Sequence, residues 1–325
     1  MFNTRIMAFD SYVPEKVVTN DDLSKIVDTN DEWISSRTGI KQRHISTGVT
    51  AGEMCVVVGK RLLEKANISP EEIDLIITAT ITPDYATPST ACLVQSGLGA
   101  VNAFAFDLTA ACSGFVYALS VADKYIKSGQ CKKALVFGSE VLSNIVDWSD
   151  RSTCVLFGDG AGGVLIEASE QGYGKIIAED MHSNGELGLT LTGGQKQPEN
   201  AFFTPEEANK KYLQMDGRAI FNFATRSVPA SVKLLLEKSN ISIDEIKYVV
   251  PHQANYRIVE VVAKKLGLPM ERFYMNMDKY GNTSSASIPI ALAEMSQQGM
   301  LEKGDKIVIT GFGGGLTWGS ILIEI

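Results

Sequence analysis

The chain has 325 residues, of which 45% are hydrophobic and 21% charged, and its formal net charge at pH 7 is −8. This composition is typical of a soluble globular protein of one or two domains. The negative charge argues against wholesale nucleic-acid binding, and no apolar run reaches the length of a membrane span or has the form of a signal-peptide core. We therefore expect neither nucleic-acid nor membrane partners. The five cysteines lack paired or metal-ligand spacing, which favours free thiols in a reducing cytoplasm and no metal site.

Segments with helical and strand-like patterns alternate along the first half of the chain. Residues 54–65 have the periodicity of an amphipathic helix, whereas residues 75–80 and 103–108 are short apolar runs typical of strands. Residues 112–128 return to helical spacing, and Gly129 follows as a stop signal. This alternation predicts mixed or parallel sheets covered by helices.

Residues 158–163 read GDGAGG and match the spacing G-x-G-x-x-G of dinucleotide-binding loops. That fingerprint requires a strand before it and a helix after it. Here apolar runs typical of strands lie on both sides, at residues 155–157 and 163–167. We therefore predict a tight hairpin over residues 158–162 and no nicotinamide cofactor.

Residues 183–216 depart from the alternating pattern. The segment is polar and glycine-rich, and Pro198 and Pro205 interrupt it. Such a long stretch without regular structure predicts either a cap between two halves of the molecule or a tolerated surface insertion.

The second half of the chain repeats the first. Residues 62–73 (LLEKANISPEEI) recur 173 positions later as residues 235–246 (LLEKSNISIDEI), with nine of twelve positions identical. We expect two copies of one α/β unit packed together, the N-terminal half at residues 1–172 and the C-terminal half at residues 173–325. The same spacing aligns residues 74–78 with 247–251, 109–119 with 282–292, and 134–138 with 307–311.

Cys112 is the first candidate for chemistry. It lies where an apolar run gives way to a helical segment, so we expect its sulfur near a helix N-terminus and unpaired backbone N–H groups. Both effects favour the thiolate, which is the nucleophilic form of cysteine. A buried structural cysteine is the alternative. We apply that alternative to the remaining cysteines: Cys55, Cys92, Cys131 and Cys154.

Among the three histidines, His252 has the most informative position. It follows the apolar run at residues 248–251 and precedes a helix-like segment, which matches the level of Cys112 if the repeat is real. His44 lies in the charged stretch KQRHIS and is expected to be solvated, whereas His182 has no obvious context.

Two further features accompany these candidates in the second half. Asn282 aligns with Thr109 in the repeat, which predicts an amide donor near the thiol, although Gly-Asn is also a strong turn former. Residues 311–315 (GFGGG) follow a strand-like run. Their N–H groups could face a developing oxyanion, or the glycines could serve close strand packing.

Together these segments resemble the 3-ketoacyl-(acyl-carrier-protein) synthase III family of the thiolase superfamily. The resemblance spans nearly the whole chain, and six motifs in the same order make it specific. The motifs are DTNDEWISSRTGI (28–40), TAACSGF (109–115), DRSTCVLFGDGAGG (150–163), PHQANYR (251–257), YGNTSSASIP (280–289) and GFGGGLTWGS (311–320).

The resemblance implies a thiolase-like duplicated α/β fold with five layers, α/β/α/β/α, and a homodimer. It implies a triad of Cys112, His252 and Asn282 that joins a short acyl-CoA primer to malonyl-acyl carrier protein by decarboxylative Claisen condensation. The products would be 3-ketoacyl-acyl carrier protein, CO2 and CoA, and the reaction would initiate type II fatty acid synthesis without a cofactor. Elongating synthases carry a second histidine at the position of Asn282, so the asparagine favours the initiating class.

The resemblance also implies roles for residues around the triad. Backbone N–H groups of Cys112 and Gly314 would form the oxyanion hole, and Trp33 and Arg151 would flank the CoA adenine with Arg37 nearby. The remaining implied contacts are Asn255, Phe312 and Thr87 for the substrates, and Gln253, Ala254, Asn255, Tyr256 and Arg257 for the carrier protein.

Local charge and one substitution bear on these partners. Arg257, Lys264 and Lys265 fall on related turns of a helix-like segment, which predicts either a docking face for an acidic carrier protein or a solvated basic face. Thr87 stands where some family members place phenylalanine in the pocket wall given by the partner subunit. The smaller side chain predicts room for a longer or branched primer.

Other functions compete with this interpretation. A polyketide-type synthase would use the same constellation, whereas a biosynthetic thiolase would need a second catalytic cysteine near the C-terminus, where GFGGGLTWGS has none. A cysteine hydrolase would resolve the acyl-enzyme with water, and a non-catalytic protein of the same fold would not acylate Cys112.

Overall fold

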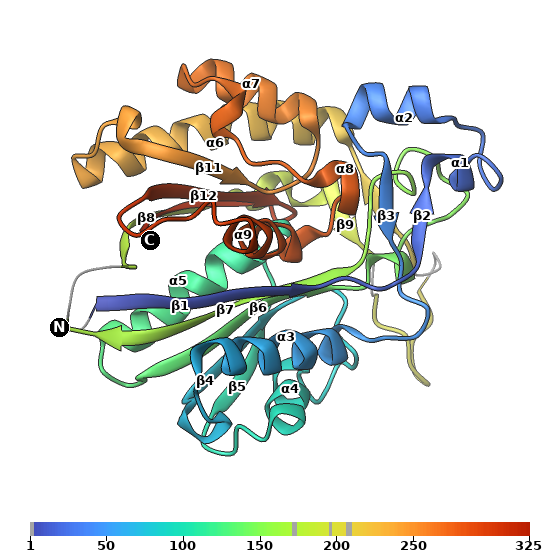
Figure 1. Ribbon diagram of the computed structural model, residues 1–325. Helices are drawn as coiled ribbons and strands as arrows, with labels where there is room; N and C mark the ends of the chain where they lie inside the picture. The colour runs from blue at the N-terminus through green and yellow to red at the C-terminus, as the bar shows by residue number, and fades with distance from the viewer. Residues whose placement is uncertain (1–2, 171–173, 195–196, 206–209) are drawn as a thin grey trace.

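The computed structural model describes residues 3–170, 174–194, 197–205 and 210–325, and two sheets with three layers of helices build it (Figure 1). The first sheet has the strand order β1-β7-β6-β4-β5, and the second has the order β11-β12-β13-β8. The strands of the first are β1 (Asn3–Tyr12), β4 (Leu75–Ala79), β5 (Phe104–Leu108), β6 (Lys133–Glu140) and β7 (Gly160–Ser169). Those of the second are β8 (Ile176–Ser183), β11 (Ile246–Pro251), β12 (Lys306–Gly313) and β13 (Thr317–Glu324).

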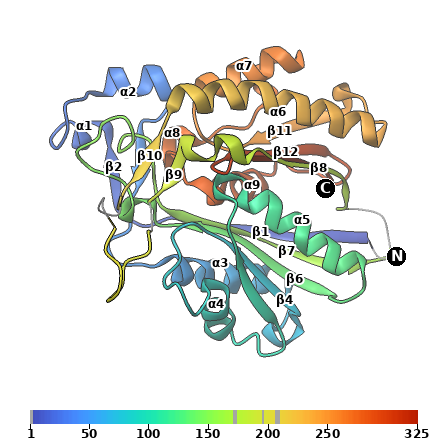
Figure 2. The ribbon, with the colours of Figure 1, turned by 180° about the vertical axis from the view of Figure 1, so that it is seen from behind.

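The helices lie between and outside the two sheets (Figures 1 and 2). Helices α5 (Gly114–Lys127) and α9 (Ser287–Gln297) fill the space between the sheets. Helices α3 (Ala51–Ala66) and α4 (Thr90–Leu98) cover the outer face of the first sheet. Helices α6 (Gly217–Ser239) and α7 (Tyr256–Leu266) cover the outer face of the second. The predicted five-layered α/β/α/β/α fold is confirmed.

The central helix α5 shows how the sequence pattern produces this layering. Its apolar positions Phe115, Leu119, Ala122 and Ile126 step by three and four residues, as predicted, and all four are fully buried. A helix between two sheets has little solvent-facing surface, so its pattern is more apolar than that of α7, which packs on one side only.

The duplication recurs element by element at the spacing seen in the sequence. Strand β6 (Lys133–Glu140) corresponds to β12 (Lys306–Gly313), and the short helix η2 (Ala111–Ser113) corresponds to η7 (Ser284–Ala286), each 173 residues later. Ala111 and Ser284 even share a left-handed backbone, with φ of 45° and 50°. Two non-glycine residues in this costly conformation at equivalent positions indicate a sharp turn that both units require.

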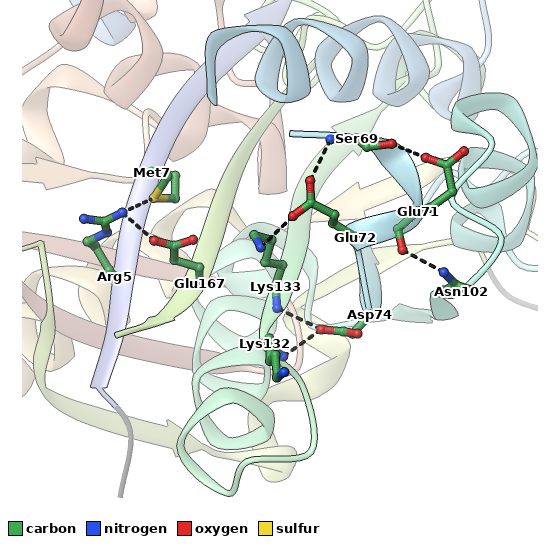
Figure 3. Close-up of polar contacts among 10 residues, drawn as sticks. All are labelled: Arg5, Met7, Ser69, Glu71, Glu72, Asp74, Asn102, Lys132, Lys133 and Glu167. Carbon is green, nitrogen blue, oxygen red and sulfur yellow. Dashed lines mark hydrogen bonds and ion pairs between the residues drawn. The ribbon is translucent and has the colours of Figure 1, made fainter. Parts of the chain in front are cut away.

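Polar contacts at the N-terminal ends of the strands also repeat, and Figure 3 shows those of the first unit. In the first unit, Lys133 Nζ lies 3.0 Å from Glu72 Oε2, and Asp74 accepts hydrogen bonds from the N–H groups of Lys132 and Lys133. In the second unit, Lys306 Nζ lies 3.0 Å from the carboxylate of Glu245. These contacts hold the short helix after α3, η1 (Pro70–Glu72), and its counterpart η5 (Ile243–Glu245) against the neighbouring strand ends.

The glycine run at residues 158–163 is not a hairpin, and this prediction was wrong. Residues 160–163 are the first four residues of β7, which pairs with both β1 and β6. A Cβ at Gly162 would lie 2.7 Å from the backbone of α9, and one at Gly163 would lie 2.6 Å from the Phe137 ring. The glycines therefore allow close packing of α9 and Phe137 on the sheet, an interaction between residues far apart in sequence.

The strand predicted over residues 155–157 is also absent. These residues form a turn, and only Phe157 makes a single β-bridge, to Asn282. Their apolar pattern instead reflects burial, because Val155 and Phe157 belong to the hydrophobic core beneath α6 and α7.

The excursion at residues 183–216 forms two short strands, β9 (Leu191–Gly193) and β10 (Leu213–Met215), after the helix η4 (Gly185–Thr190). Its ends contact the rest of the fold, since Leu213 N–H donates to Ile145 O (2.7 Å) and Asn184 pairs with Leu316 through two backbone hydrogen bonds. Part of the excursion, and the expected boundary between the halves at residues 172–173, lie outside the described residues.

A small layer beside α7 completes the fold (Figure 1). Helix α2 (Asp31–Thr38) lies next to the start of α7, where the arginine side chain at position 257 donates to Ser36 O over 3.0 Å. Within the described ranges, no helix is long and apolar enough to cross a membrane. The other elements of this region are α1 (Asn20–Leu23), β2 (Val17–Thr19), β3 (Gln42–His44) and α8 (Met277–Tyr280).

Candidate active site

Cys112 lies at the junction between β5 and α5, in the middle of η2. The left-handed backbone of Ala111 turns the chain sharply there, and the Ser113 hydroxyl donates to Thr317 O over 2.9 Å. That bond joins the first unit to β13 of the second. The cysteine is 7% exposed, so its sulfur lies inside the molecule at the interface between the two units.

The glycine loop after β12 packs directly on this cysteine. A Cβ at Gly313 would lie 2.8 Å from Cys112 Cβ and 2.9 Å from Cys112 N, and one at Gly314 would lie 3.3 Å from Ala111 Cβ. The structure therefore shows the close-packing role that the sequence left open. The oxyanion role is compatible with this packing, because Gly313 lies against the backbone of Cys112 and Gly314 follows it.

His252 follows the last residue of β11, as predicted. Its N–H donates to Thr310 O (2.8 Å), its Nδ1 lies 2.7 Å from Ser287 Oγ, and its ring stands edge-on to Phe312 with centroids 5.2 Å apart. The side chain is 2% exposed. Burial lowers the pKa of His252 to about 3, so the imidazole is neutral at physiological pH.

Asn282 enters the site from the turn before η7. Its carboxamide oxygen accepts a hydrogen bond from Ser284 N–H (2.9 Å), and its own N–H donates to Leu156 O (2.8 Å). Because Ser284 N–H already binds the carboxamide oxygen, the NH2 group of Asn282 is the donor that is available to a ligand. The turn and the functional interpretation of Asn282 are therefore compatible.

These three side chains, remote in sequence, line one cavity of about 120 Å³ together with Phe312. A second, apolar cavity of about 250 Å³ also has Cys112 in its wall. Cys112, Phe157 and Leu191 border both cavities, so the sulfur lies between them. Phe312, which the resemblance implied as a substrate contact, lines the cavity of His252 and Asn282 but not the apolar cavity.

The excursion supplies part of the apolar cavity. Leu191, Gly193 and Leu213 line it, opposite Ile81 and Leu142 of the first unit. Of the two interpretations left open by the sequence, a wall or cap of the site fits the structure, because an insertion without a role would not border the sulfur.

The ionisation of Cys112 differs from the sequence-based expectation. Burial raises the pKa of the thiol to about 12, although hydrogen bonds from Ser284 and from the cysteine's own backbone N–H lower it. The helix start that favoured a thiolate is real, but α5 begins two residues later and the sulfur is shielded from water. In the resting protein Cys112 is therefore a thiol, and its proton must leave when the sulfur attacks.

The residues expected at the CoA adenine cluster around one indole ring. The guanidinium carbon of Arg37 lies 4.8 Å from the centre of the Trp33 ring, and that of Arg151 lies 5.3 Å from it. Arg151 Nη1 also donates to Asp28 O over 2.9 Å. The indole is half-buried and both arginines are exposed, which makes this cluster an accessible aromatic and cationic surface.

The segment expected to dock the carrier protein is only partly accessible. Gln253 is 1% exposed, its amide donates to Pro251 O and Tyr274 O, and its carbonyl accepts from Asn276 N–H. A docking role for Gln253 was therefore wrong, because its side chain fixes the backbone around His252. Tyr256 and Arg257 are exposed at the start of α7, whereas Ala254 and Asn255 are half-buried and line the cavity of His252.

Other candidates lie elsewhere. Thr87 is exposed and lines neither cavity of the single chain. His44 is half-buried and its Nδ1 lies 2.6 Å from Pro14 O, whereas His182 Nε2 lies 2.8 Å from Asp180. Cys92 is exposed, contrary to the structural interpretation that holds for the buried Cys55, Cys131 and Cys154.

Three polar residues that contact the candidate site or its neighbours were missed by the sequence analysis: Glu140, Ser284 and Ser287. Ser287 contacts His252, and Ser284 contacts both Asn282 and Cys112. Glu140 is fully buried at the end of β6 and accepts a hydrogen bond from Ser284. The repeat carried a signal, since Ser285 is the counterpart of Cys112 and marks its neighbours as site residues.

Comparison with known proteins identifies the class of this site. The model of the 3-Oxoacyl-[acyl-carrier-protein (ACP)] synthase III family matches residues 106–185, and the model of the C-terminal part of that family matches residues 236–325. The solved 3-oxoacyl-[acyl-carrier-protein] synthase III from Aquifex aeolicus superposes with a TM-score of 0.92 at 49% identity, over 99% of this chain and 100% of that chain. The fold and the site define a condensing enzyme of the thiolase superfamily, an acyltransferase.

Relatives in sequence place the chain more narrowly. The beta-ketoacyl-[acyl-carrier-protein] synthase III of Streptococcus mutans is 55% identical over 97% of both chains. The priming β-ketosynthase of the R1128 polyketide pathway is also similar, with a TM-score of 0.90 at 33% identity over 99% of this chain and 96% of that chain. The chain belongs to the 3-oxoacyl-[acyl-carrier-protein] synthase III family.

Proposed function

We propose that this protein condenses the acyl group of a short acyl-CoA with malonyl-acyl carrier protein. The products are 3-ketoacyl-acyl carrier protein, CO2 and CoA, and the reaction initiates type II fatty acid synthesis. The observation that carries the proposal is the convergence of Cys112, His252 and Asn282 on one cavity. Membership of the synthase III family supports the same chemistry.

In the first half-reaction, Cys112 attacks the acyl-CoA thioester, and CoA leaves. The N–H groups of Cys112 and Gly314 hold the oxyanion of the tetrahedral intermediate. The contact of the glycine loop with the cysteine backbone supports this role. Removing one donor from such a hole typically costs about 3 kcal/mol of barrier. The apolar cavity beyond the sulfur accommodates the acyl chain.

In the second half-reaction, malonyl-acyl carrier protein loses CO2, and the resulting enolate needs hydrogen-bond donors at its oxygen. The NH2 group of Asn282 is one donor, because its carbonyl is already occupied by Ser284 N–H. Neutral His252 is the other when its ring proton is on Nε2, which requires Ser287 to turn its hydroxyl from Ser284 O (2.8 Å) to Nδ1 (2.7 Å). The carbanion attacks the acyl-cysteine, and no cofactor takes part in either step.

CoA binding involves the surface around Trp33. Its indole stacks on the adenine, and Arg37 and Arg151 contribute positive charge near the nucleotide's phosphates. Because α2 is docked on the start of α7, this surface adjoins the entrance marked by Asn255.

The carrier protein docks at the start of α7, through Tyr256 and Arg257 and the neighbouring Ala254 and Asn255. Arg257→Glu should raise the KM for malonyl-acyl carrier protein but leave acylation of Cys112 by acyl-CoA unchanged. Lys60→Glu, at an exposed position of α3 on the first sheet and away from α7, is the matched control for net charge. An equal loss of both half-reactions in R257E would contradict the assignment.

The functional unit is a homodimer, and exposed apolar residues beside an edge strand support it. Strand β5 ends the first sheet, and Phe104 on it and Val101 before it are 45% and 71% exposed. An uncovered edge of this kind favours pairing with another chain. In the dimer, Thr87 enters the acyl cavity of the partner subunit and leaves room for a branched primer. T87F should lower kcat/KM for isobutyryl-CoA relative to acetyl-CoA, and an unchanged ratio would remove Thr87 from the pocket.

Product analysis tests the whole proposal. Intact-mass measurement after incubation with acetyl-CoA should show one acetyl group on Cys112 and none on C112S. Addition of malonyl-acyl carrier protein should give 3-ketoacyl-acyl carrier protein and CO2, whereas free acid would identify a hydrolase. A panel of acyl-CoA primers separates a fatty acid role from a polyketide-priming role.

Two further assignments belong to this proposal. The chain divides into an N-terminal half at residues 1–172 with the nucleophile and a C-terminal half at residues 173–325 with His252 and Asn282. The protein works in the cytoplasm, which five free cysteines within the described residues support.

A further inference from the structure

Glu140 is a buried carboxyl group for which the proposed condensation has no use. It ends β6, it is fully buried, and no lysine, arginine or histidine is among the hydrogen-bond partners found in the described part of the chain. An unpaired buried carboxylate is costly, and protonation relieves the cost. Burial accordingly raises the pKa of Glu140.

The two oxygens of this carboxyl group have different surroundings. Oε2 accepts from Ile81 N–H (3.0 Å) and from the hydroxyls of Thr82 (2.8 Å) and Thr80 (3.3 Å). Oε1 faces two hydroxyls only, those of Ser284 (3.1 Å) and Ser285 (2.9 Å). A hydroxyl can reverse its direction and a backbone N–H cannot, so Oε1 is the oxygen that can accept and return a proton.

The Ser284 hydroxyl connects this oxygen to the nucleophile. It donates to Oε1 of Glu140 over 3.1 Å, and Ser284 lines the same apolar cavity as Cys112. Interaction with this hydroxyl lowers the pKa of the Cys112 thiol, and the hydroxyl has one proton for the two partners. Two arrangements satisfy all three groups. Either the thiol donates to Ser284, which donates to an ionised Glu140, or a protonated Glu140 donates to Ser284, which donates to a thiolate. Ser285 adapts to both, because Ala79 O is a second acceptor 2.9 Å from its hydroxyl.

We propose that Glu140 takes the Cys112 proton through Ser284 during acylation and holds it for the lifetime of the acyl-enzyme. The proposal rests on the proposed condensation and names a further group in it. As sulfur bonds the acyl carbon, the thiol proton moves to Ser284 Oγ and the serine proton moves to Oε1. CoA leaves as the thiolate and is protonated by solvent. When the malonyl-derived carbanion displaces Cys112, the protonated Glu140 returns its proton and the resting thiol re-forms.

This order of proton transfers explains why the carboxyl group is buried without a cation. Glu140 is ionised only in the resting state and is neutral throughout the acyl-enzyme. His252 cannot replace it as the proton acceptor in the resting state, because burial keeps the imidazole from accepting a proton above about pH 3. Since it acts through Ser284, Glu140 is a positioning residue for the proton and does not touch the substrate.

Few other titratable groups surround Glu140. Cys112 of η2 and Cys55 of α3 are the ones coupled to it, and burial raises the pKa of Cys55 so that it stays protonated. The neighbours from the loop after β4 and from η7 are hydroxyls and backbone groups. A pH effect on acylation near neutrality therefore reports on the Glu140–Cys112 pair.

Single-turnover acylation by acetyl-CoA, followed by intact mass from pH 5 to 9, tests the proposal. E140Q keeps the shape of the side chain but cannot accept the proton, so acylation at pH 7 should fall by about 10²-fold. The acylation rate of the wild type should rise with pH through the folded pKa of Glu140 and then level off. The acylation rate of E140Q should instead keep rising as the pH approaches the pKa of the thiol.

The opposite result has a clear physical meaning. If Glu140 acts only by its charge, which raises the pKa of the thiol, then E140Q should speed acylation and alkylation by iodoacetamide. A faster or unchanged rate in E140Q would overturn the proposal. If the wild type is acylated but forms no 3-ketoacyl product, the second step of the proposed function is wrong. If E140Q is acylated at the normal rate, the role of Glu140 in acylation is wrong, whatever product is formed.

Variants at the two serines remain informative if E140Q folds poorly. S284A should lose acylation to a similar extent. S285A is the matched control, because Ser285 bonds the same Oε1 but is not on the path to sulfur. In the E140Q/S284A double variant the losses should not add. Equal effects of S284A and S285A, or additive losses in the double variant, would refute the path through Ser284.

Discussion

The packing of Gly313 on the nucleophile gives a sharp prediction for one methyl group. In G313A the new Cβ would lie 2.8 Å from Cys112 Cβ and 2.9 Å from Cys112 N. Unstrained contacts between carbon atoms need about 3.5–4.0 Å, so Cys112 or the end of β12 must move by roughly 1 Å. Both atoms belong to the ordered interior, and neither is the end of a flexible side chain that could turn away.

The expected cost has two parts. Overpacking of this kind typically destabilises a protein by about 1–3 kcal/mol. A displacement of about 1 Å at the reacting atom can reduce a rate by about 10²-fold. We therefore expect G313A to remain folded with a lower melting temperature and to acylate Cys112 about 10²-fold more slowly.

Quenched single-turnover acylation with acetyl-CoA measures the loss of rate, and thermal unfolding measures the loss of stability. G185A is the matched control, because a Cβ at Gly185 meets no atom within 4 Å and the change in backbone freedom is the same. G185A should acylate at the wild-type rate. If G313A acylates as fast as G185A, the glycine does not position the nucleophile and the packing argument fails.

Two further predictions concern His252. The Ser287 hydroxyl lies 2.7 Å from Nδ1 and 2.8 Å from Ser284 O, and it keeps the ring proton on Nε2 only while it donates to Nδ1. S287A removes this donor, so condensation should fall by about 10-fold to 10²-fold while acylation is retained, and equal loss of both steps would contradict the role of Ser287. The folded pKa of about 3 lies below the ordinary value of 6.5, so the unfolded chain binds more protons between these pH values and stability falls as pH drops through that window. Denaturant unfolding at pH 6, 5 and 4 should show this loss, at most about 1.4 kcal/mol per pH unit, in the wild type but not in H252Q; parallel pH dependences in the two proteins would refute it.

Much of the fold could be predicted because its signals are local. The helical spacing of Phe115, Leu119, Ala122 and Ile126 identified α5, and the repeated segment at residues 62–73 and 235–246 predicted two similar units. Strand ends are also visible in a sequence, since apolar runs stop there. The candidates Cys112 and His252 followed from this local pattern.

The errors have a common physical cause. A hairpin was predicted at the glycines of β7 because no neighbouring residue in the sequence indicates that α9 and Phe137 pack against them. The docking role of Gln253, which only the resemblance implied, fails because its side chain bonds Tyr274 O and Asn276 N–H from another part of the chain. In each case a contact distant in sequence decided the role of the residue.

The sequence alone determined the duplicated architecture, the two strand ends that carry a thiol and an imidazole, and the turn that carries a carboxamide, because periodicity and repetition are visible in the order of the residues. Only the tertiary structure decided the protonation of Cys112 and His252, the wall that the excursion gives to the apolar cavity, and the placement of Glu140 behind Ser284. Burial sets a pKa, and burial depends on how the two units close over these groups, which no local pattern in the chain encodes.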